Sequence, residues 1–441
     1  MTRKPDASLL IFRICAVVVV LGFAFTYGVM AQKHRLFPMP QIRSATEQIK
    51  ELLAPSDQIL VASNVRYDTP VESLLPDRLA PGLLMVAEIV QDRDTAVRII
   101  DRSGQTIHEW RPVWSEVWPG STGNFPEDRR PKGDSGMYLH GVDILPDASI
   151  VANFEHLSSF RMDVCGAVDW KLDNLGHHSV HYSDQGATWV AAERYVQQGP
   201  TGYQNHAAPL RSWTLQEVSD DGEVLREISM IDVFLRNGLE GLLFMSTLSN
   251  GRTVVRGDTL HLNDVDIFPQ GMASSVFAPG DIMVSLRNIN TIAVFDPDTL
   301  EMKFVSTGQV LRHHDPDFMP GDRISIFDNR NLTPSTEPIP PASRVVEVNA
   351  RTGEASVALN GEGPDGFFTN IMGVHQRLPN GNILVTSSGE GRALEYLPDG
   401  QLAWRYSNRI SDEINGRIFM TKLLPADMDA AFFETRAATC N

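Results

Sequence analysis

Apolar and polar residues follow two contrasting patterns along this chain of 441 residues. Near the N-terminus an apolar stretch runs from Ile14 to Ala31, which at about 1.5 Å per helical residue nearly crosses the hydrocarbon core of a membrane. Beyond about residue 79, short runs of alternating apolar and polar positions predict β-strands, because successive side chains of a strand point to opposite faces. The pattern therefore predicts an N-terminal membrane segment and a β-rich body.

Two classes of turn signal recur through the body and indicate repeated hairpins. The first class precedes β-branched runs and comprises residues 145–148, 183–186, 278–281, 319–322 and 378–381. The second class alternates with the first and comprises residues 101–104, 219–222, 296–299, 349–353 and 397–400. Two hairpins per unit make a four-stranded sheet, and six units begin near Leu83, His140, His178, His261, His314 and His375.

Repeated four-stranded antiparallel sheets shield their edges when they pack radially, so the fold class is predicted as all-β, a six-bladed β-propeller. A β-sandwich array in two domains is the alternative fold. The expected organisation is a signal anchor or signal peptide over 1–35, a stalk with a short amphipathic helix over 36–78, the propeller over 79–425 and a C-terminal tail over 426–441. A second helix is expected between Ile231 and Ser246.

Composition and charge narrow the classes of function. A hydrophobic content of 42% supports a sizeable core, and the net charge of −17 argues against nucleic-acid binding. An anionic substrate would therefore need a local basic pocket. Basic residues before the apolar stretch slightly outnumber those after it, which favours an anchor in the inner membrane with the body in the periplasm. Cleavage near Ala31, which would release the body into the periplasm, is the alternative.

The body contains two cysteines, Cys165 and Cys440, besides Cys15 in the apolar stretch. An oxidising compartment would permit a disulfide between them, which would hold the C-terminal tail. Two unpaired thiols are an equal alternative, because separation in sequence says nothing about distance.

Histidines open five of the six units. They are His140, the pair His177 and His178, His261, the pair His313 and His314, and His375. The first strand of each blade lines the central channel of a propeller, so these side chains are expected to converge on one rim. A hairpin returns the end of its second strand to the same rim, which adds Arg287 and the segment 328–330.

Neutral imidazoles beside a guanidinium and amides suit a tetrahedral oxyanion such as a sulfuryl or phosphoryl group. One histidine could attack the group while another moves a proton. A metal site is the competing interpretation, because His177, His178, His181 and the run 313–317 contain good ligand types. Their spacing matches no closed zinc pattern, so neither a metal nor another cofactor is expected.

The order of the His261-Leu-Asn263 segment, the strand end at Arg287 and His314 before the strand 324–329 resembles the bacterial arylsulfate sulfotransferase family. This resemblance extends from about residue 83 to 419. It implies a periplasmic six-bladed propeller that moves a sulfuryl group from a phenolic sulfate ester to a phenol by a ping-pong route, without a nucleotide donor.

By this resemblance a sulfated histidine is the intermediate, and each role passes to a matching position. The nucleophile is His314, the sulfuryl-binding groups are Arg287 and Asn263, and the other catalytic histidines are His261 and His178, with His177 as an alternative to His178. Substrate binding is assigned to the remaining rim residues, namely His140, His177, His375 and Asn329.

The sequence departs from the family pattern in the acidic residues after His314, in the long interval between His261 and Arg287, and in the lack of a large N-terminal β-domain. Two other functions therefore stay open. One is a propeller that binds a sulfated or carboxylated ligand without catalysis, and the other is a metal-dependent lactonase-like or quinoprotein-like propeller. The expected partners are a phenolic donor and acceptor and, through the N-terminal helix, a membrane. The oligomeric state stays open, with a homodimer as one option.

Overall fold

The computed structural model describes residues 7–34, 60–62, 69–91, 94–127, 129–131, 133–134, 137–196, 206–245, 255–331 and 341–440. The chain divides into two compact units, Met1–Asp57 and Gln58–Asn441. In the first unit, helix α1 (Ala7–His34) contains a segment, Ile11–Ala31, that is long and apolar enough to cross a membrane or to act as a signal sequence. The amphipathic helix predicted in 41–53 lies outside the described residues.

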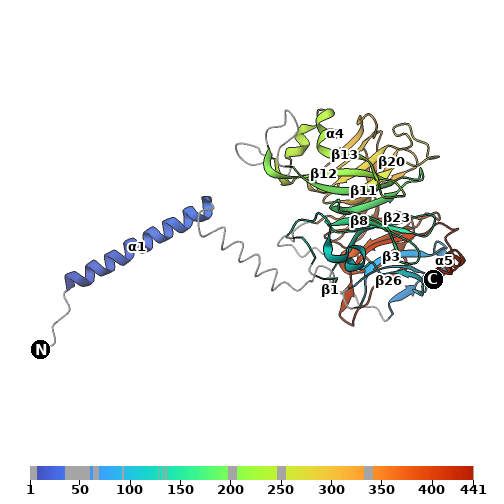
Figure 1. The fold of residues 1–441 in the computed structure, drawn as a ribbon, viewed down its shortest axis with the longest axis horizontal. Helices are drawn as coiled ribbons and strands as arrows, with labels where there is room; N and C mark the ends of the chain where they lie inside the picture. Colours follow the sequence, from blue (N-terminus) through green and yellow to red (C-terminus); the bar gives the residue numbers. More distant parts are fainter. Residues whose placement is uncertain are drawn as a thin grey trace. The chain divides into compact units, whose positions relative to one another are not determined.

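The second unit is built of β-sheets (Figure 1). Six of its sheets each contain a row of four antiparallel strands, and this confirms the predicted six-bladed β-propeller. In order from the channel outward, the blades are β28 (Ile418–Leu423), β3 (Leu84–Ile89), β4 (Thr95–Ile100) and β5 (Thr106–Trp110); β6 (Leu139–Ile144), β7 (Ile150–Phe154), β8 (Ser158–Met162) and β9 (Val168–Leu172); β10 (Gly176–Tyr182), β11 (Thr188–Val196), β12 (His206–Val218) and β13 (Val224–Ser229); β15 (Leu262–Ile267), β16 (Ile282–Leu286), β17 (Thr291–Phe295) and β18 (Met302–Thr307); β19 (His314–Met319), β20 (Arg323–Asp328), β21 (Arg344–Asn349) and β22 (Ala355–Asn360); and β23 (Val374–Arg377), β24 (Ile383–Ser387), β25 (Arg392–Tyr396) and β26 (Leu402–Ser407).

Four short strands add to this framework, two at the blades and two in a separate pair. Strand β14 (Val255–Asp258) pairs in parallel with β12, β2 (Val71–Ser73) pairs with the outer strand β26, and β1 (Leu60–Ala62) pairs with β27 (Ile414–Gly416). The short helices of this unit are η1 (Pro76–Arg78), α3 (Trp114–Val117), η3 (Pro119–Ser121), α4 (Met230–Arg236), η4 (Glu240–Phe244), η5 (Arg287–Ile289), η6 (Ser388–Glu390) and α5 (Ala430–Ala437).

The ring closes through strands from opposite ends of the chain. Strand β28, near the C-terminus, pairs antiparallel with β3 and supplies the innermost strand of that blade. The unit predicted to begin at Leu83 therefore begins with its second strand, and the prediction of a channel-lining strand there was wrong. A chain that closes in this way leaves no open edge between its first and last blades.

Both classes of predicted hairpin turn are present between the expected strands. The turn after β4 is typical, because the Asp101 carboxylate accepts hydrogen bonds from the backbone N–H groups of Ser103 and Gln105. The single helix predicted between Ile231 and Ser246 is instead two short pieces, α4 and η4. They are separated at Gly238, whose φ of 67° suits glycine and ends the first helix.

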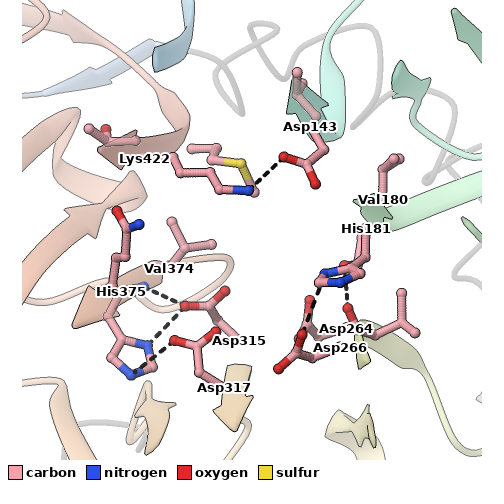
Figure 2. A pocket seen from close by; sticks show the side chains of 16 residues that line it. Asp143, Val180, His181, Asp264, Asp266, Asp315, Asp317, Val374, His375 and Lys422 are labelled. Carbon is pink, nitrogen blue, oxygen red and sulfur yellow. Dashed lines mark hydrogen bonds and ion pairs between the residues drawn. The ribbon is translucent and has the colours of Figure 1, made fainter. Parts of the chain in front are cut away.

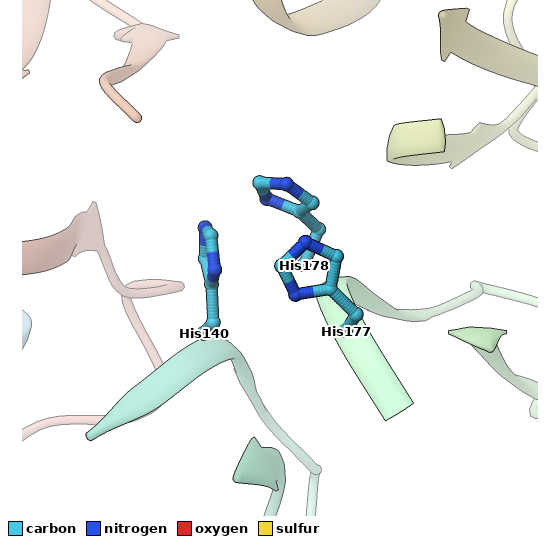
Figure 3. A group of neighbouring side chains, drawn as sticks. All are labelled: His140, His177 and His178. Carbon is cyan, nitrogen blue, oxygen red and sulfur yellow. The ribbon is translucent and has the colours of Figure 1, made fainter. Parts of the chain in front are cut away.

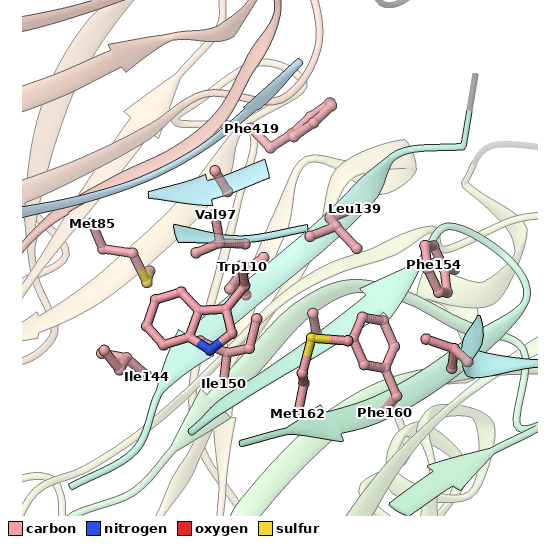
Figure 4. Close-up of a cluster of buried hydrophobic side chains, with 14 of the residues drawn as sticks. Met85, Val97, Trp110, Leu139, Ile144, Ile150, Phe154, Phe160, Met162 and Phe419 are labelled. Atoms are coloured by element: carbon pink, nitrogen blue, oxygen red, sulfur yellow. The ribbon is translucent and has the colours of Figure 1, made fainter. Parts of the chain in front are cut away.

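The apolar core lies between neighbouring blades. Trp110, Met85 and Val97 of the first blade pack with Phe154 and Phe160 of the next, and all five are buried (Figure 4). Every residue of the middle strands β7, β16, β17 and β24 is buried, because each blade is covered on both faces. This packing fixes the inner strands, and with them the residues that face the channel.

A disulfide joins Cys165, in the turn between β8 and β9, to Cys440 beyond α5, with the Cα atoms 5.3 Å apart. Of the two alternatives that the sequence left open, the structure shows the pair. Helix α5 follows the closing strand β28, and its Phe433 packs edge-on against Trp110 of β5. The disulfide therefore holds the C-terminal segment against the blade next to the one in which the ring closes.

Candidate functional site

The six inner strands bring the strand-opening residues together, and an irregularity repeated in five of these strands turns their side chains. Strands β6, β10, β15, β19 and β28 each shift register near their first residues. Positive φ angles occur at the same level, at His178 (56°), His261 (54°) and Asp315 (51°). Bulges of this kind re-aim side chains, and backbone strain of this kind gathers at functional sites.

The close approach of two of these strands depends on one glycine. Gly141 follows His140 and has a φ of 96°. A Cβ at this position would lie 1.8 Å from the carbonyl oxygen of His178, so only glycine fits. The closeness of His140 to His178 is a direct consequence.

His314 is held with one ring nitrogen occupied and the other available. Its Nδ1 lies 2.7 Å from Oδ1 of Asn329, and the Asn329 amide donates from Nδ2 to the carbonyl oxygens of Thr369 and Met372. Because these two bonds fix the orientation of the amide, Oδ1 faces His314 and Nδ1 carries the proton. Among the described residues Nε2 of His314 has no hydrogen-bond partner, and the side chain is buried.

Arg287 brings positive charge to His314. Burial, and then the charge of Arg287, lowers the pKa of His314 well below its usual range, so the imidazole is neutral. Burial, and then the neighbouring Arg312, lowers the pKa of Arg287 to about 10, which leaves the guanidinium charged at neutral pH. A neutral imidazole beside a partly buried guanidinium is suited to bind and attack an oxyanion.

His178 and His261 form a chain that ends at a carboxylate. Their Nε2 atoms lie 2.8 Å apart, and Nδ1 of His261 donates to Oδ2 of Asp258. Although burial alone would raise it, the pKa of Asp258 is held at about 2 by hydrogen bonds from His261 and Trp213. Burial lowers the pKa of His261 to about 4. The His178 ring lies 5.8 Å from the His314 ring, so this chain can move a proton beside His314.

A second group of histidines adjoins this chain. The rings of His140, His177 and His178 pack together, with centroids 3.8 Å apart for the pairs His140 with His178 and His177 with His178 (Figure 3). Burial, and then neighbouring histidines, lowers the pKa of each well below its usual range. The histidine cluster, as we call His140, His177, His178, His261 and His314 together, therefore consists of neutral imidazoles.

His375 does not join the histidine cluster, contrary to the prediction that it binds substrate there. Its Nδ1 lies 2.9 Å from Asp315 Oδ2 and its Nε2 lies 2.6 Å from Ser325 Oγ. The side chain lines a separate channel cavity of about 250 Å³. On strand β23, the side chain of His375 points toward Asp315 of the neighbouring blade and not toward the rim.

In this cavity, which we call the acidic chamber, five of the sixteen lining residues are aspartates of the inner strands (Figure 2). They are Asp143, Asp264, Asp266, Asp315 and Asp317. Lys422 lies 2.6 Å from Asp143, and His181 lies 3.4 Å from Asp266. Burial, and then repulsion from Asp315, raises the pKa of Asp264 and of Asp317 well above the usual range. An anionic substrate is disfavoured in this chamber.

Two asparagines predicted to contact substrate make hydrogen bonds to backbone carbonyls near His314 in the structure. The Asn263 amide donates from Nδ2 to the carbonyl oxygen of His313, 2.7 Å away, and so supports the backbone before His314. Asn329 uses both of its amide hydrogens on backbone carbonyls. Both asparagines help to position His314, and their contact with substrate stays a prediction.

Comparison with known families gives a direct result. The sequence profile described as "Arylsulfotransferase (ASST)" matches residues 141–409. The chain belongs to the arylsulfotransferase family. The family match spans the histidine cluster from His177 to His314 and Arg287, and His140 lies one residue before it. A comparison with curated proteins finds no match.

Solved structures resemble this arylsulfotransferase family member weakly. A protein of unknown function from Bacteroides caccae is 12% identical with a TM-score of 0.45, over 78% of this chain and 98% of that one. A nidogen/laminin complex is 9% identical with a TM-score of 0.43, over 77% of this chain and 97% of that one. A streptogramin B lyase is 9% identical with a TM-score of 0.38, over 81% of this chain and 91% of that one. Likenesses at these scores carry no argument about function.

Several residues of the candidate site in this family member were not predicted from the sequence. Asp258 precedes His261 by three residues, Glu155 and His156 lie in the turn between β7 and β8, and Arg417 precedes β28. Burial raises the pKa of Glu155 to about 7, although the nearby His156 and Arg417 act to lower it. Arg417 occupies the same strand-opening position as the rim histidines, which was the one available signal, but β28 was not recognised as an inner strand.

The ligand types noted in the sequence are distributed over different places. His181 faces the acidic chamber, away from His177 and His178, and His313 is fully buried. Burial lowers the pKa of His313 to about 3. Within the described parts of the chain, three other groups have ligand atoms within 4.8 Å of one another: His140 with His177 and His178, Glu155 with His156 and His177, and Asp315 with Asp317 and His375.

Proposed function

We propose that this protein transfers a sulfuryl group from a phenolic sulfate ester to a phenolic acceptor, without a nucleotide donor, through a sulfated His314. The observation that carries the proposal is the buried Nε2 of His314, which is neutral, has no partner among the described residues and lies near Arg287 in a member of the arylsulfotransferase family. Asn329 supports it by keeping the proton on Nδ1, which leaves the lone pair on Nε2.

In the first half-reaction the lone pair of His314 Nε2 attacks sulfur. The bond between sulfur and the aryl oxygen breaks, and its electron pair stays on that oxygen. Arg287 binds the sulfuryl oxygens through the planar donor set of its guanidinium. The ring of His314 becomes positively charged as it bonds to sulfur, and the hydrogen bond from Nδ1–H to Asn329 strengthens with that charge.

The leaving phenolate takes a proton from the His178–His261 pair. Both imidazoles are neutral in the free site, so the pair takes up this proton from solvent when the anionic sulfate ester binds. His178 gives its Nδ1 proton to the phenolate oxygen and receives the proton that His261 holds on Nε2. Asp258 stabilises the protonated His261 before this transfer. The first product is a neutral phenol.

In the second half-reaction an acceptor phenol gives its proton to His178 and attacks the sulfur on His314. The bond between sulfur and Nε2 breaks, and its electron pair returns to the nitrogen. The pair His178 and His261 regains the extra proton, so the enzyme returns to its starting state. Donor and acceptor use the same site in turn, which is the basis of a ping-pong mechanism.

The proposed location is the periplasm, with α1 as an inner-membrane anchor or as a cleaved leader. The apolar segment Ile11–Ala31 supports membrane entry. The disulfide between Cys165 and Cys440 supports an oxidising compartment, because such bonds rarely persist in the cytosol.

The test uses the full chain in detergent, nitrophenyl sulfate as donor, a phenol as acceptor and no nucleotide. Samples quenched during turnover are digested and analysed by mass spectrometry. We expect a sulfuryl group on the peptide that contains His314, and a loss of about 10³-fold or more in rate for His314→Ala.

The matched control is His181→Ala, which removes a histidine of β10 that faces the acidic chamber. Transfer without a sulfated His314 peptide, or full activity in His314→Ala, would contradict the assignment. Binding of an aryl sulfate without any transfer would favour the ligand-binding alternative.

A further inference from the structure

We propose that His140, His156, His177 and Glu155 bind one divalent transition-metal ion, Zn²⁺ above others, on the wall of the histidine cluster. These residues come from β6, from the turn between β7 and β8, and from β10. The proposal goes beyond sulfuryl transfer, and its test measures bound metal and not activity.

Three imidazole nitrogens surround one carboxylate oxygen. Glu155 Oε1 lies 3.1 Å from His140 Nδ1, 3.8 Å from His177 Nδ1 and 3.8 Å from His156 Nε2. In tetrahedral coordination with bonds of about 2.1 Å, ligand atoms lie about 3.4 Å apart. Glu155, His156 and His177 have ligand atoms within 4.8 Å of one another, and His140 is hydrogen-bonded to Glu155, so the rings must move for all four ligand atoms to reach one ion.

His177 is the residue that points most directly to a ligand. Its side chain is 1% exposed, and among the described residues neither ring nitrogen has a hydrogen-bond partner. A buried polar atom left without a partner costs about 1–3 kcal/mol. A cation bound at Nδ1 would satisfy this nitrogen, and a neutral imidazole is the form that binds a metal.

His156 has the supporting contact that zinc-binding histidines commonly have. Its Nδ1 donates to Glu193, which leaves the lone pair of Nε2 directed toward the Glu155 side. Glu193 is itself fixed by Arg129 and Arg211, at 3.3 Å and 3.2 Å. The rings of His156 and His177 stack with 22° between their planes, so metal binding requires them to open.

The ligand set selects the class of metal. Three imidazoles and one carboxylate favour Zn²⁺ or its neighbours over Ca²⁺ and Mg²⁺, which prefer oxygen ligands. The acidic chamber has the opposite composition, with several carboxylates around His375. We therefore place the transition metal at Glu155, and the chamber serves as the comparison in the test.

In the experiment, the full chain in detergent is treated with a chelator and then given a small molar excess of Zn²⁺. Bound metal is measured by mass spectrometry after gel filtration. Co²⁺ is used in parallel because its visible absorption reports tetrahedral coordination. We expect about one ion per chain. His177→Ala and His156→Ala should each lower bound metal at least tenfold, and Glu193→Gln should weaken the affinity about 10- to 100-fold.

The control variants are His181→Ala, on the same strand as His177, and Asp315→Asn in the acidic chamber, which should both keep the ion. Absence of bound metal in the unmodified protein, or its retention in both His177→Ala and His156→Ala, would overturn the proposal. Loss in Asp315→Asn alone would move the site to the chamber and also overturn it. If His177→Ala shows no cooperative thermal unfolding, the partly exposed His156 and the conservative Glu193→Gln carry the test.

Discussion

Replacing Asn329 tests how the site makes His314 a nucleophile. Asn329→Ala removes the oxygen that accepts the Nδ1–H of His314 at 2.7 Å. This bond strengthens as the ring gains positive charge during attack, so its loss acts on the transition state more than on binding. A hydrogen bond to a charged partner contributes about 1.5–3 kcal/mol, which corresponds to a fall in kcat of about 10- to 100-fold with little change in KM.

A purely structural role for Asn329 is separated by two further variants. Asn382→Ala removes a buried asparagine in the turn between β23 and β24, whose amide donates to Glu395 and to the carbonyl oxygen of Arg78. Asn382→Ala should lower thermal stability and leave kcat unchanged. Asn329→Asp places a carboxylate beside Nδ1, which should raise the pKa of His314 and shift the acidic limb of the pH profile to higher pH.

The assays are steady-state kinetics of nitrophenyl sulfate cleavage across pH, with thermal unfolding followed by circular dichroism. An unchanged kcat in Asn329→Ala would refute the role of the hydrogen bond in catalysis. A pH profile in Asn329→Asp that matches the unmodified protein would refute the contact with His314.

Three other predictions concern the anion contact, acid stability and the disulfide. Arg287→Lys should lower kcat/KM for aryl sulfates about 10- to 100-fold, because one ammonium cannot replace the planar donor set. The control Arg161→Lys, at an arginine of β8 that pairs with Asp147, should not lower it. The pKa of His313 is about 3 in the fold against about 6.5 when unfolded, so the unfolded state binds more protons between these two pH values. This residue should therefore lower the free energy of unfolding by about 1.4 kcal/mol for each unit by which the pH is lowered in that window. In urea titrations at several pH values, the free energy of unfolding of His313→Gln should depend less steeply on pH. An equal dependence on pH would contradict this prediction. Replacing Cys165 and Cys440 with serine should lower the free energy of unfolding by about 2–4 kcal/mol while transfer at 25 °C persists, and an unchanged melting temperature would count against this role.

The repeating turn signals were enough to predict the blades. Turn residues act locally, so Asp101 in its turn and the apolar alternation of the strands could be interpreted without the fold. Ring closure was different, because nothing near Ile418 in the sequence shows that its strand pairs with β3 more than 300 residues earlier. That contact depends on the geometry of the whole ring.

The candidate site shows the same division. Histidines at strand starts indicated a shared rim, and His140, His177, His178, His261 and His314 meet there. His375 matched the same pattern but faces the acidic chamber. The bulges in the inner strands decide which side chain turns toward the rim, and a bulge depends on the neighbouring strand that the sequence pattern does not include.

The sequence by itself determined the apolar helix, the number of blades and the residue types available for sulfuryl chemistry, because these follow from local periodicity and spacing. Only the tertiary structure decided which atoms of those residues are free. The tautomer of His314 depends on Asn329, the proton relay depends on Asp258, and the grouping of three imidazoles depends on Glu155. Each of these depends on contacts between side chains and on burial, which periodicity does not report.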